Sequence, residues 1–357
     1  MTPWKYIALT GRRPPRRLFG IGLGAGLLGG AVMLGLRYFI RPPVQARLPD
    51  TAAGPAFRSR VFASSHGQVV YHESVFFPDP DSVESEGFPP LVFVHDFGVG
   101  VSSYEWSKVA AAFAGPHRVL APDLIGFGES ERPHVALRPA GHVAVLAEFL
   151  QATLYDSGAV LIASGGGAAL CAQLAAEHPA LVRRLVLLAP RGRAGVAWWR
   201  RVAVRVPNLG RYLYRNVSAR RERLRHSLET TAFADPARVT DEMVEVFTLC
   251  AQQYLAGIAV RAWWAGWLDV DLEKNFAQLL CPTTLLLAAG STIHDKETAA
   301  RLAAINPRAV AGPPRTLSDG GPLFAALEAP ETLAAVLREE FAAAENGCAQ
   351  PVAAREI

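Results

Sequence analysis

The stretch with the clearest chemical meaning is a turn of small residues, Ala163-Ser164-Gly165-Gly166-Gly167, between an apolar strand and a helix. The apolar run from Ala159 to Ala163 predicts the strand, and the helix is expected to end at His178-Pro179. A strand, a sharp turn and a helix in this order are typical of the G-x-S-x-G motif, which presents a strained nucleophile at the top of a sheet. The segment therefore predicts a site for acyl-transfer chemistry, with Ser164 as a candidate nucleophile.

The register of this turn places a glycine at the nucleophile position. Small residues are needed two positions before and two positions after the nucleophile, because the strand and helix backbones approach closely there. Ala163 and Gly167 meet this need only if the central residue is Gly165. With Ser164 at the centre, the β-branched side chain of Ile162 would occupy the crowded first position, where it fits badly. We therefore predict Gly165 at the nucleophile position and Ser164 one residue early.

Other motifs, in order along the chain, resemble the α/β-hydrolase fold superfamily of the AB hydrolase-1 type. Residues 91–98 (LVFVHDFG) resemble its strand and oxyanion loop, usually His-Gly-x-Gly, and residues 102–106 (SSYEW) begin the first helix. Residues 118–130 (RVLAPDLIGFGES) resemble the next strand and its Asp-x-x-Gly-x-Gly-x-Ser loop, in wording most similar to a cyanobacterial and plastid-type branch. The resemblance implies a three-layer α/β fold: a mostly parallel central sheet, helices on both faces, and a helical lid at about residues 191–280.

The resemblance also implies a catalytic triad, completed by an acid after the seventh strand and a histidine after the eighth. Residues 283–290 (TTLLLAAG) resemble the seventh strand, and the acid position falls on Ile293, two residues before Asp295. The Gly-His segment corresponds to residues 318–323 (SDGGPL), and no histidine follows His294. A serine needs an adjacent base to become a nucleophile, so the triad is degenerate. The remaining candidate catalytic residues are Ser164, Asp96, Asp295 and His294.

The oxyanion loop departs from the family pattern as well. The backbone N–H groups of Phe97 and Gly166 are the expected donors to a developing negative charge. Asp96 replaces the usual glycine beside them, and a carboxylate there would oppose an oxyanion unless it is protonated or turned away. The alternative is that Asp96 only hydrogen-bonds the neighbouring loop. His95 is expected to be a hydrogen-bonded scaffold residue, and Asp123 a carboxylate that holds its loop.

The amino-terminal region carries a second signal. Leu18 to Leu36 is an uncharged run of 19 residues, about the length needed to span a bilayer. Gly22, Gly26 and Gly30 have the small-xxx-small spacing that supports helix pairing and a homodimer. The alternative is an export signal, because Arg16-Arg17-Leu18-Phe19 resembles a twin-arginine motif. No small-x-small cleavage site follows, which favours a retained anchor. Basic residues are more frequent before the run than after it, which places the globular domain on the non-cytoplasmic side.

The length of 357 residues and a 50% hydrophobic composition suit one α/β domain. The four cysteines are scattered without metal-ligand spacing, and the glycine-rich residues 20–30 lack the context of a nucleotide-binding turn, so no metal and no cofactor are expected. The predicted organisation is a basic segment with an anchor or signal (1–41), a linker (42–57), the α/β-hydrolase domain (58–343) and a tail (344–357).

The first half of the predicted lid is strongly basic. Eleven arginines fall between Arg191 and Arg225, together with Trp198 and Trp199. Arginine with interfacial aromatic residues suits anionic lipid head groups. The alternative is a solvated basic helix face whose aromatic residues cover a pocket. Nucleic acid is not an expected partner, because the chain contains no recognised nucleic-acid module.

Two functions are consistent with these observations. In the first, a membrane-anchored α/β-hydrolase-fold protein has lost serine-hydrolase chemistry and binds a small apolar molecule, a lipid or a protein partner. In the second, the protein is an active hydrolase of ester or lipid substrates that uses Ser164 or a non-standard set of residues.

Overall fold

The computed structural model describes residue 40 and residues 56–348, except 76–88, 155–157, 194, 196, 207 and 311. The apolar run 18–36, with Gly22, Gly26 and Gly30, therefore lies outside the described residues, as does nearly all of the predicted linker. The predicted homodimer contact and membrane orientation fall on the same residues.

The centre of the domain is an eight-stranded sheet with the order β1-β2-β4-β3-β5-β6-β7-β8. Strands β3 to β8 run parallel to one another, whereas β1 and β2 are antiparallel additions at one edge. The parallel strands are short apolar runs because both of their faces are buried. The predicted three-layer α/β-hydrolase fold is confirmed. The strands are β1 (Phe57–Ser64), β2 (Gly67–Ser74), β3 (Leu91–Val94), β4 (Val119–Pro122), β5 (Ala159–Ser164), β6 (Val182–Leu188), β7 (Thr283–Leu287) and β8 (Arg315–Thr316).

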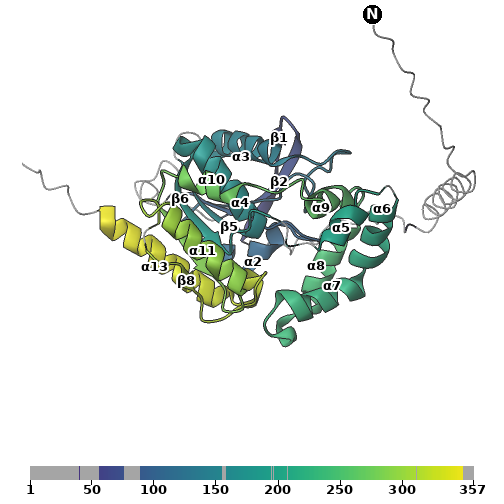
Figure 1. Cartoon of the computed structure of the whole chain (residues 1–357). Helices are drawn as coiled ribbons and strands as arrows, with labels where there is room; N and C mark the ends of the chain where they lie inside the picture. Colours follow the sequence, from purple (N-terminus) through teal and green to yellow (C-terminus); the bar gives the residue numbers. More distant parts are fainter. Residues whose placement is uncertain are drawn as a thin grey trace, which may run out of the picture.

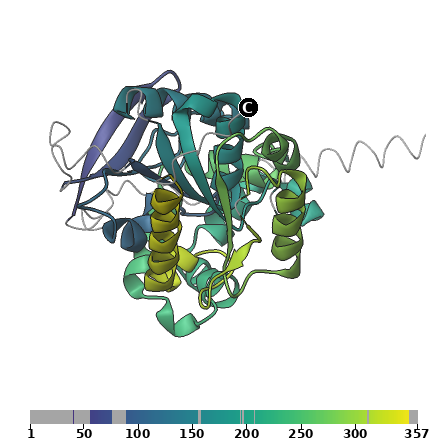
Figure 2. The ribbon, with the colours of Figure 1, turned by 90° about the vertical axis from the view of Figure 1, so that its left-hand side faces the viewer.

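Alternate strand residues pack against different helical layers, as the period of a strand requires. Leu161 and Ala163 of β5 face a cluster that includes α3 (Pro139–Leu154), α4 (Gly165–Glu177), α10 (Leu272–Ala277) and α11 (Ile293–Ile305). Val160 and Ile162 face the opposite cluster, built from η3, α2, α12 and α13. Figure 2 shows α13 and α11 on opposite sides of the sheet. The elements of the second layer are η3 (Ser103–Trp106), α2 (Ser107–Ala111), α12 (Ala325–Glu328) and α13 (Pro330–Cys348).

The segment between β6 and β7 is helical, and most of its helices group at one side of the molecule (Figure 1). Its longest helix, α8, begins after Thr240, whose side chain accepts a hydrogen bond from Met243 N and so caps the helix. Buried residues of α8 pack on Tyr104 and Phe324, which ties the lid to the sheet domain. The lid elements are α5 (Trp198–Ala203), α6 (Leu209–Leu213), η5 (Tyr214–Ser218), α7 (Arg221–Ser227), η6 (Leu228–Ala232), η7 (Pro236–Arg238), α8 (Asp241–Gln252) and α9 (Gly257–Trp264).

Of the helices in the described ranges, none is long and apolar enough to cross a bilayer alone. The consecutive helices α8 and α9, bent by 90° at their junction, pass that test of length and composition only as a pair.

Candidate functional site

The elbow between β5 and α4 has the backbone of a nucleophile turn, and Gly165 occupies its strained position. Gly165 has a φ of +50°, whereas Ser164 is extended with a φ of −117°. A Cβ added at Gly167 would lie 2.2 Å from the carbonyl oxygen of His95, which explains the need for a glycine there. Ser164 ends the strand and lies at the position before the turn, on the face of β5 that faces η3.

The side chain of Asp96 fills the space above this elbow. Its Oδ1 accepts hydrogen bonds from Gly166 N at 2.5 Å and from Phe97 N at 2.6 Å. These are the two N–H groups expected to stabilise an oxyanion, and they converge on one carboxylate oxygen instead. A Cβ added at Gly165 would lie only 2.1 Å from Asp96 Oδ2. A carboxylate of the protein itself thus occupies both the oxyanion position and the space of the missing nucleophile.

The Ser164 hydroxyl lies beneath the elbow and is bonded to an acid that the sequence did not single out. Ser164 Oγ donates to Glu105 Oε1 at 2.5 Å, and Asp96 N donates to Glu105 Oε2 at 2.9 Å. Ser164 is 2% exposed and Glu105 is 1% exposed. Burial and the nearby charge of Asp96 raise the pKa of Glu105 to about 8. Burial likewise raises the pKa of Asp96, although Arg191 and the two N–H groups favour its charged form.

The raised pKa of Glu105 predicts that the protein loses stability as the pH rises. The pKa of Glu105 is near 8 in the folded protein and 4.5 in the unfolded chain. Its contribution to the stability of the protein is therefore complete below pH 4.5 and is lost progressively as the pH rises to 8. The loss is about 1.4 kcal/mol for each pH unit of that interval. Glu105→Gln mimics the protonated acid, because its amide can accept from Asp96 N and donate to Ser164 Oγ.

We therefore expect the variant to be more stable than wild type at pH 8 and to lose less stability between pH 5 and 8. Urea denaturation at several pH values measures this difference. Parallel pH profiles of the two proteins would contradict it.

Arg191 connects the three loops that would carry a triad. Its backbone N donates to Gly165 O at 2.9 Å, and its guanidinium donates to Pro322 O at 2.9 Å. The same guanidinium forms an ion pair with Asp295, with Nε 3.0 Å from Oδ1. Asp295 also forms the capping box of α11 with Thr292. The carboxylate is thus held at the start of the helix. Burial by itself would raise the pKa of Asp295, but Arg191 and Thr292 together lower it below its usual value.

His294 lies beside Asp295 in α11, and its side chain is exposed. The candidate residues Ser164, Asp96 and Asp295 are therefore brought to one region of the protein through Glu105 and Arg191. In the described ranges, no histidine side chain is hydrogen-bonded to the Ser164 hydroxyl or to the Asp96 carboxylate, and His95 Nδ1 contacts only the backbone carbonyl of Asp96.

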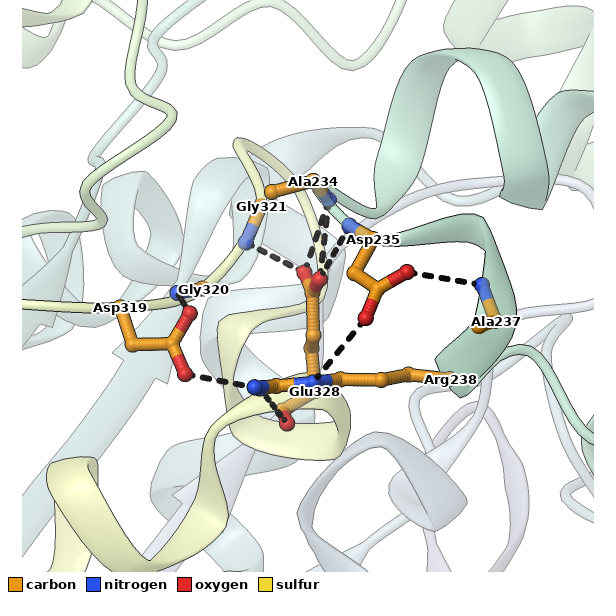
Figure 3. Close-up of polar contacts among 8 residues, drawn as sticks. All are labelled: Ala234, Asp235, Ala237, Arg238, Asp319, Gly320, Gly321 and Glu328. Atoms are coloured by element: carbon orange, nitrogen blue, oxygen red, sulfur yellow. Dashed lines mark hydrogen bonds and ion pairs between the residues drawn. The ribbon is translucent and has the colours of Figure 1, made fainter.

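The loop that would carry the histidine is closed by Glu328. The Glu328 carboxylate, 5% exposed, accepts from Gly321 N at 2.5 Å and from Asp235 N at 2.7 Å, and Ala234 N lies 3.0 Å from both of its oxygens. Arg238 donates to Asp319 at 2.8 Å and to the Glu328 carbonyl at 2.9 Å (Figure 3). The lid segment after η6 is thereby joined to the loop after β8.

The same closure leaves little room for a histidine side chain. A Cβ at Gly321 would lie 2.3 Å from Ala232 O, and Gly320 has a φ of +98° with Ala325 Cβ 2.9 Å from its added Cβ. The atom nearest to the added Cβ of Gly321 is a backbone oxygen, which cannot move aside as the end of a flexible side chain can. The absent histidine is therefore accompanied by changes in packing around its position.

His95 and Asp123, two polar residues of the family-like motifs, have structural roles here. His95 Nε2 accepts from Leu124 N at 2.9 Å, so the proton lies on Nδ1, which donates to Asp96 O at 2.7 Å. Asp123 accepts from Ser103 N and Glu129 N, each at 2.7 Å. These bonds explain the scaffold roles expected for both residues. In the described part of the chain, no group of three or more histidine, cysteine or acidic side chains is arranged to hold a metal ion.

Sequence reasoning missed Glu105, Arg191 and Glu328. Glu105 stands inside the predicted first helix, Arg191 follows β6, and Glu328 is the last residue of α12. The only available signals were a charged residue in an apolar surrounding and a cation directly after a buried strand.

Comparison with known proteins agrees with this architecture. The model of the alpha/beta hydrolase fold family matches residues 89–314, which is more than half of the chain, and the chain belongs to that family. The crystal structure of Cfl2 from Burkholderia cenocepacia is similar with a TM-score of 0.67 and 25% identity, covering 84% of this chain and all of that one. Haloalkane dehalogenase DbeA from Bradyrhizobium elkani has a TM-score of 0.61 and 21% identity, covering 82% and 99%.

Curated relatives match over a shorter stretch. A 2-hydroxymuconate semialdehyde hydrolase of Pseudomonas sp. (strain CF600) is 41% identical over 120 residues, 31% of this chain and 38% of the relative. A haloalkane dehalogenase of Bradyrhizobium diazoefficiens is 37% identical over 100 residues, 28% and 31% of the two chains. The matched stretch thus spans about a third of these relatives, which include hydrolases.

Proposed function

We propose that this α/β-hydrolase-family protein does not carry out serine-hydrolase chemistry and instead acts by binding an apolar small molecule, a lipid or a protein partner. One observation carries the proposal: Asp96 Oδ1 accepts hydrogen bonds from both N–H groups of the oxyanion position. A substrate carbonyl could enter only if this carboxylate left, and its departure would leave two buried donors without a partner.

The surroundings of the elbow support the same proposal. The nucleophile position is a glycine, and the histidine loop is packed against backbone of the lid. The Ser164 hydroxyl is buried against Glu105. The backbone of Ser164 is extended and does not have the positive φ of the nucleophile position. Each element needed for an acyl-enzyme is therefore either absent or used for another contact.

A fluorophosphonate probe tests this proposal directly. We expect no labelling of the wild-type protein under conditions in which a known serine hydrolase is labelled completely, because Ser164 is bonded to Glu105 and the oxyanion N–H groups are bonded to Asp96. Ser164→Ala is the matched variant and is expected to be equally unlabelled. Wild-type labelling that disappears in Ser164→Ala would overturn the proposal.

A second candidate is an enzyme that uses the short contact between Ser164 and Glu105. Above its pKa of about 8, Glu105 is a carboxylate next to a hydroxyl and can act as a base, and relatives of this chain are hydrolases. The same labelling experiment separates the two, because this mechanism requires Ser164 and predicts labelling that Glu105→Gln reduces.

We further infer that residues 18–36 hold the protein at a membrane, with the domain on the non-cytoplasmic side, as their length and the flanking charges suggest. The full chain is expected in the membrane fraction, and a chain that starts at Phe57 is expected in the soluble fraction. Two soluble fractions would contradict the anchor.

A further inference from the structure

The helix α5 presents an apolar face outward. Trp198 is 78% exposed, Trp199 is 51% exposed and Val202 is 55% exposed. Positions 198, 199 and 202 fall on one side of a helix, and we call these three residues the α5 face. Isolated exposed apolar residues are ordinary, but two neighbouring tryptophans with a valine form a contiguous patch. Such a patch indicates a surface that gains free energy when it leaves water.

The surroundings of the α5 face are positively charged. Residues 191–225 contain eleven arginines and one acid, Glu222. Ion pairs involve several of them: Arg191, Arg201, Arg220, Arg221 and Arg225. Arg193, Arg211 and Arg223 are exposed and have no ion pair within the described residues. The lid therefore carries a net positive charge close to exposed tryptophans.

The arginines are close enough to affect one another. Burial, and then repulsion from Arg223, lower the pKa of Arg200, whose guanidinium lies over the rings of Trp199 and Trp264 at 5.6 and 5.1 Å. Burial, and then Arg211, lower the pKa of Arg215. An anionic surface would relieve this repulsion.

We propose that the α5 face docks on the surface of a bilayer that contains anionic phospholipids. Tryptophan rings settle at the boundary between head groups and acyl chains, with an apolar body and a polar N–H. Guanidinium groups bind phosphate oxygens through paired N–H donors, so the arginines of residues 191–225 suit the same surface as the tryptophans. Nucleic acid would complement the charge but not the aliphatic side chain of Val202. This inference goes beyond the binding role of the hydrolase core, because it does not depend on Asp96 or Gly165.

A dye placed on the α5 face tests the proposal in the full chain. Cys171, Cys250 and Cys281 are buried, so Cys348→Ser with Val202→Cys provides one reactive thiol for an environment-sensitive dye. The protein is then incorporated into phosphatidylcholine vesicles with and without phosphatidylglycerol. We expect a blue shift, and quenching by brominated acyl chains, only when phosphatidylglycerol is present.

The matched control carries the dye at Leu280, which is 80% exposed and lies between α10 and β7, outside the lid helices α5 to α9. This dye should not respond, even when residues 18–36 hold the chain at the bilayer. The ratio of protein molecules whose dye at position 202 contacts lipid to those whose dye is exposed to water should fall when Arg193, Arg211 and Arg223 are replaced with glutamine. We expect a fall of roughly a hundredfold, about fivefold for each arginine. A Val202 dye that responds without phosphatidylglycerol, that is already shielded before lipid is added, or that behaves like the Leu280 dye would overturn the proposal.

Discussion

Replacing Gly165 with alanine is expected to destabilise the fold by about 4 kcal/mol, as measured by urea denaturation. The added Cβ would lie 2.1 Å from the Asp96 carboxylate, which is itself held by Gly166 N and Phe97 N. The φ of +50° adds the ordinary cost of a left-handed backbone for a residue with a side chain. Serine at the same position is expected to be destabilising for the same reasons, so restoring a nucleophile alone does not restore a site.

Asp96→Gly should reverse the steric part of this cost. The change removes the carboxylate and introduces the residue usual at this position of the family loop. In the Asp96→Gly background, Gly165→Ala is expected to cost about 2 kcal/mol less than in wild type, which a double-mutant cycle measures. The variant with Asp96→Gly and Gly165→Ser should still resist a fluorophosphonate probe, because residues 318–323, where the family carries its histidine, contain none.

Two other glycines separate the contributions. Gly195→Ala should be nearly neutral, since an added Cβ there meets nothing within 4 Å. Gly115 also has open space but a φ of +124°, so Gly115→Ala reports the backbone cost without a clash. If Gly165→Ala proved no more destabilising than Gly115→Ala, Asp96 would not occupy the elbow as described.

Replacing Glu328 with alanine should have a comparable effect, about 4 kcal/mol. The buried carboxylate accepts hydrogen bonds from the backbone N–H groups of Gly321, Ala234 and Asp235, and its loss leaves all three without this acceptor. Glu328→Gln keeps one carbonyl oxygen and is expected to cost about half as much. Hydrogen exchange should show residues 232–238 exposed more often in both variants, because these bonds hold the lid segment to the loop after β8 (Figure 3).

Glu331, an exposed acid three residues further along, is the matched control. Glu331→Ala should cost less than about 1 kcal/mol, the usual contribution of an acid in the first turn of a helix. Equal effects at Glu328 and Glu331 would show that the contacts of Glu328 do not stabilise the lid.

Much of the fold could be predicted because each element leaves a local pattern. The apolar run from Ala159 to Ala163 lies in β5, and the apolar run before Gly290 contains β7. The elbow register was also readable, since close approach of two backbones restricts residue size within five consecutive positions. The observed φ of Gly165 agrees with that register.

The role of Asp96 could not be predicted from the sequence. The sequence indicated that a carboxylate replaces the glycine of the oxyanion loop, and left open whether it serves chemistry or its own loop. Which of the two holds depends on a side-chain direction. The structure directs Asp96 Oδ1 at the N–H groups of Phe97 and Gly166, which belong to segments some seventy residues apart in the chain.

The sequence by itself determined where several strands lie along the chain, the position of the elbow and the absence of a histidine after His294. The first two properties follow from residue size and polarity along short stretches, and the third is read directly from the sequence. Only the tertiary structure decided that Glu105 lies under Ser164, that Arg191 joins Asp295 to the elbow, and that Glu328 closes the histidine loop. The physical reason is that a buried charge is stabilised by groups distant in sequence, and chain folding alone brings those groups within hydrogen-bonding distance.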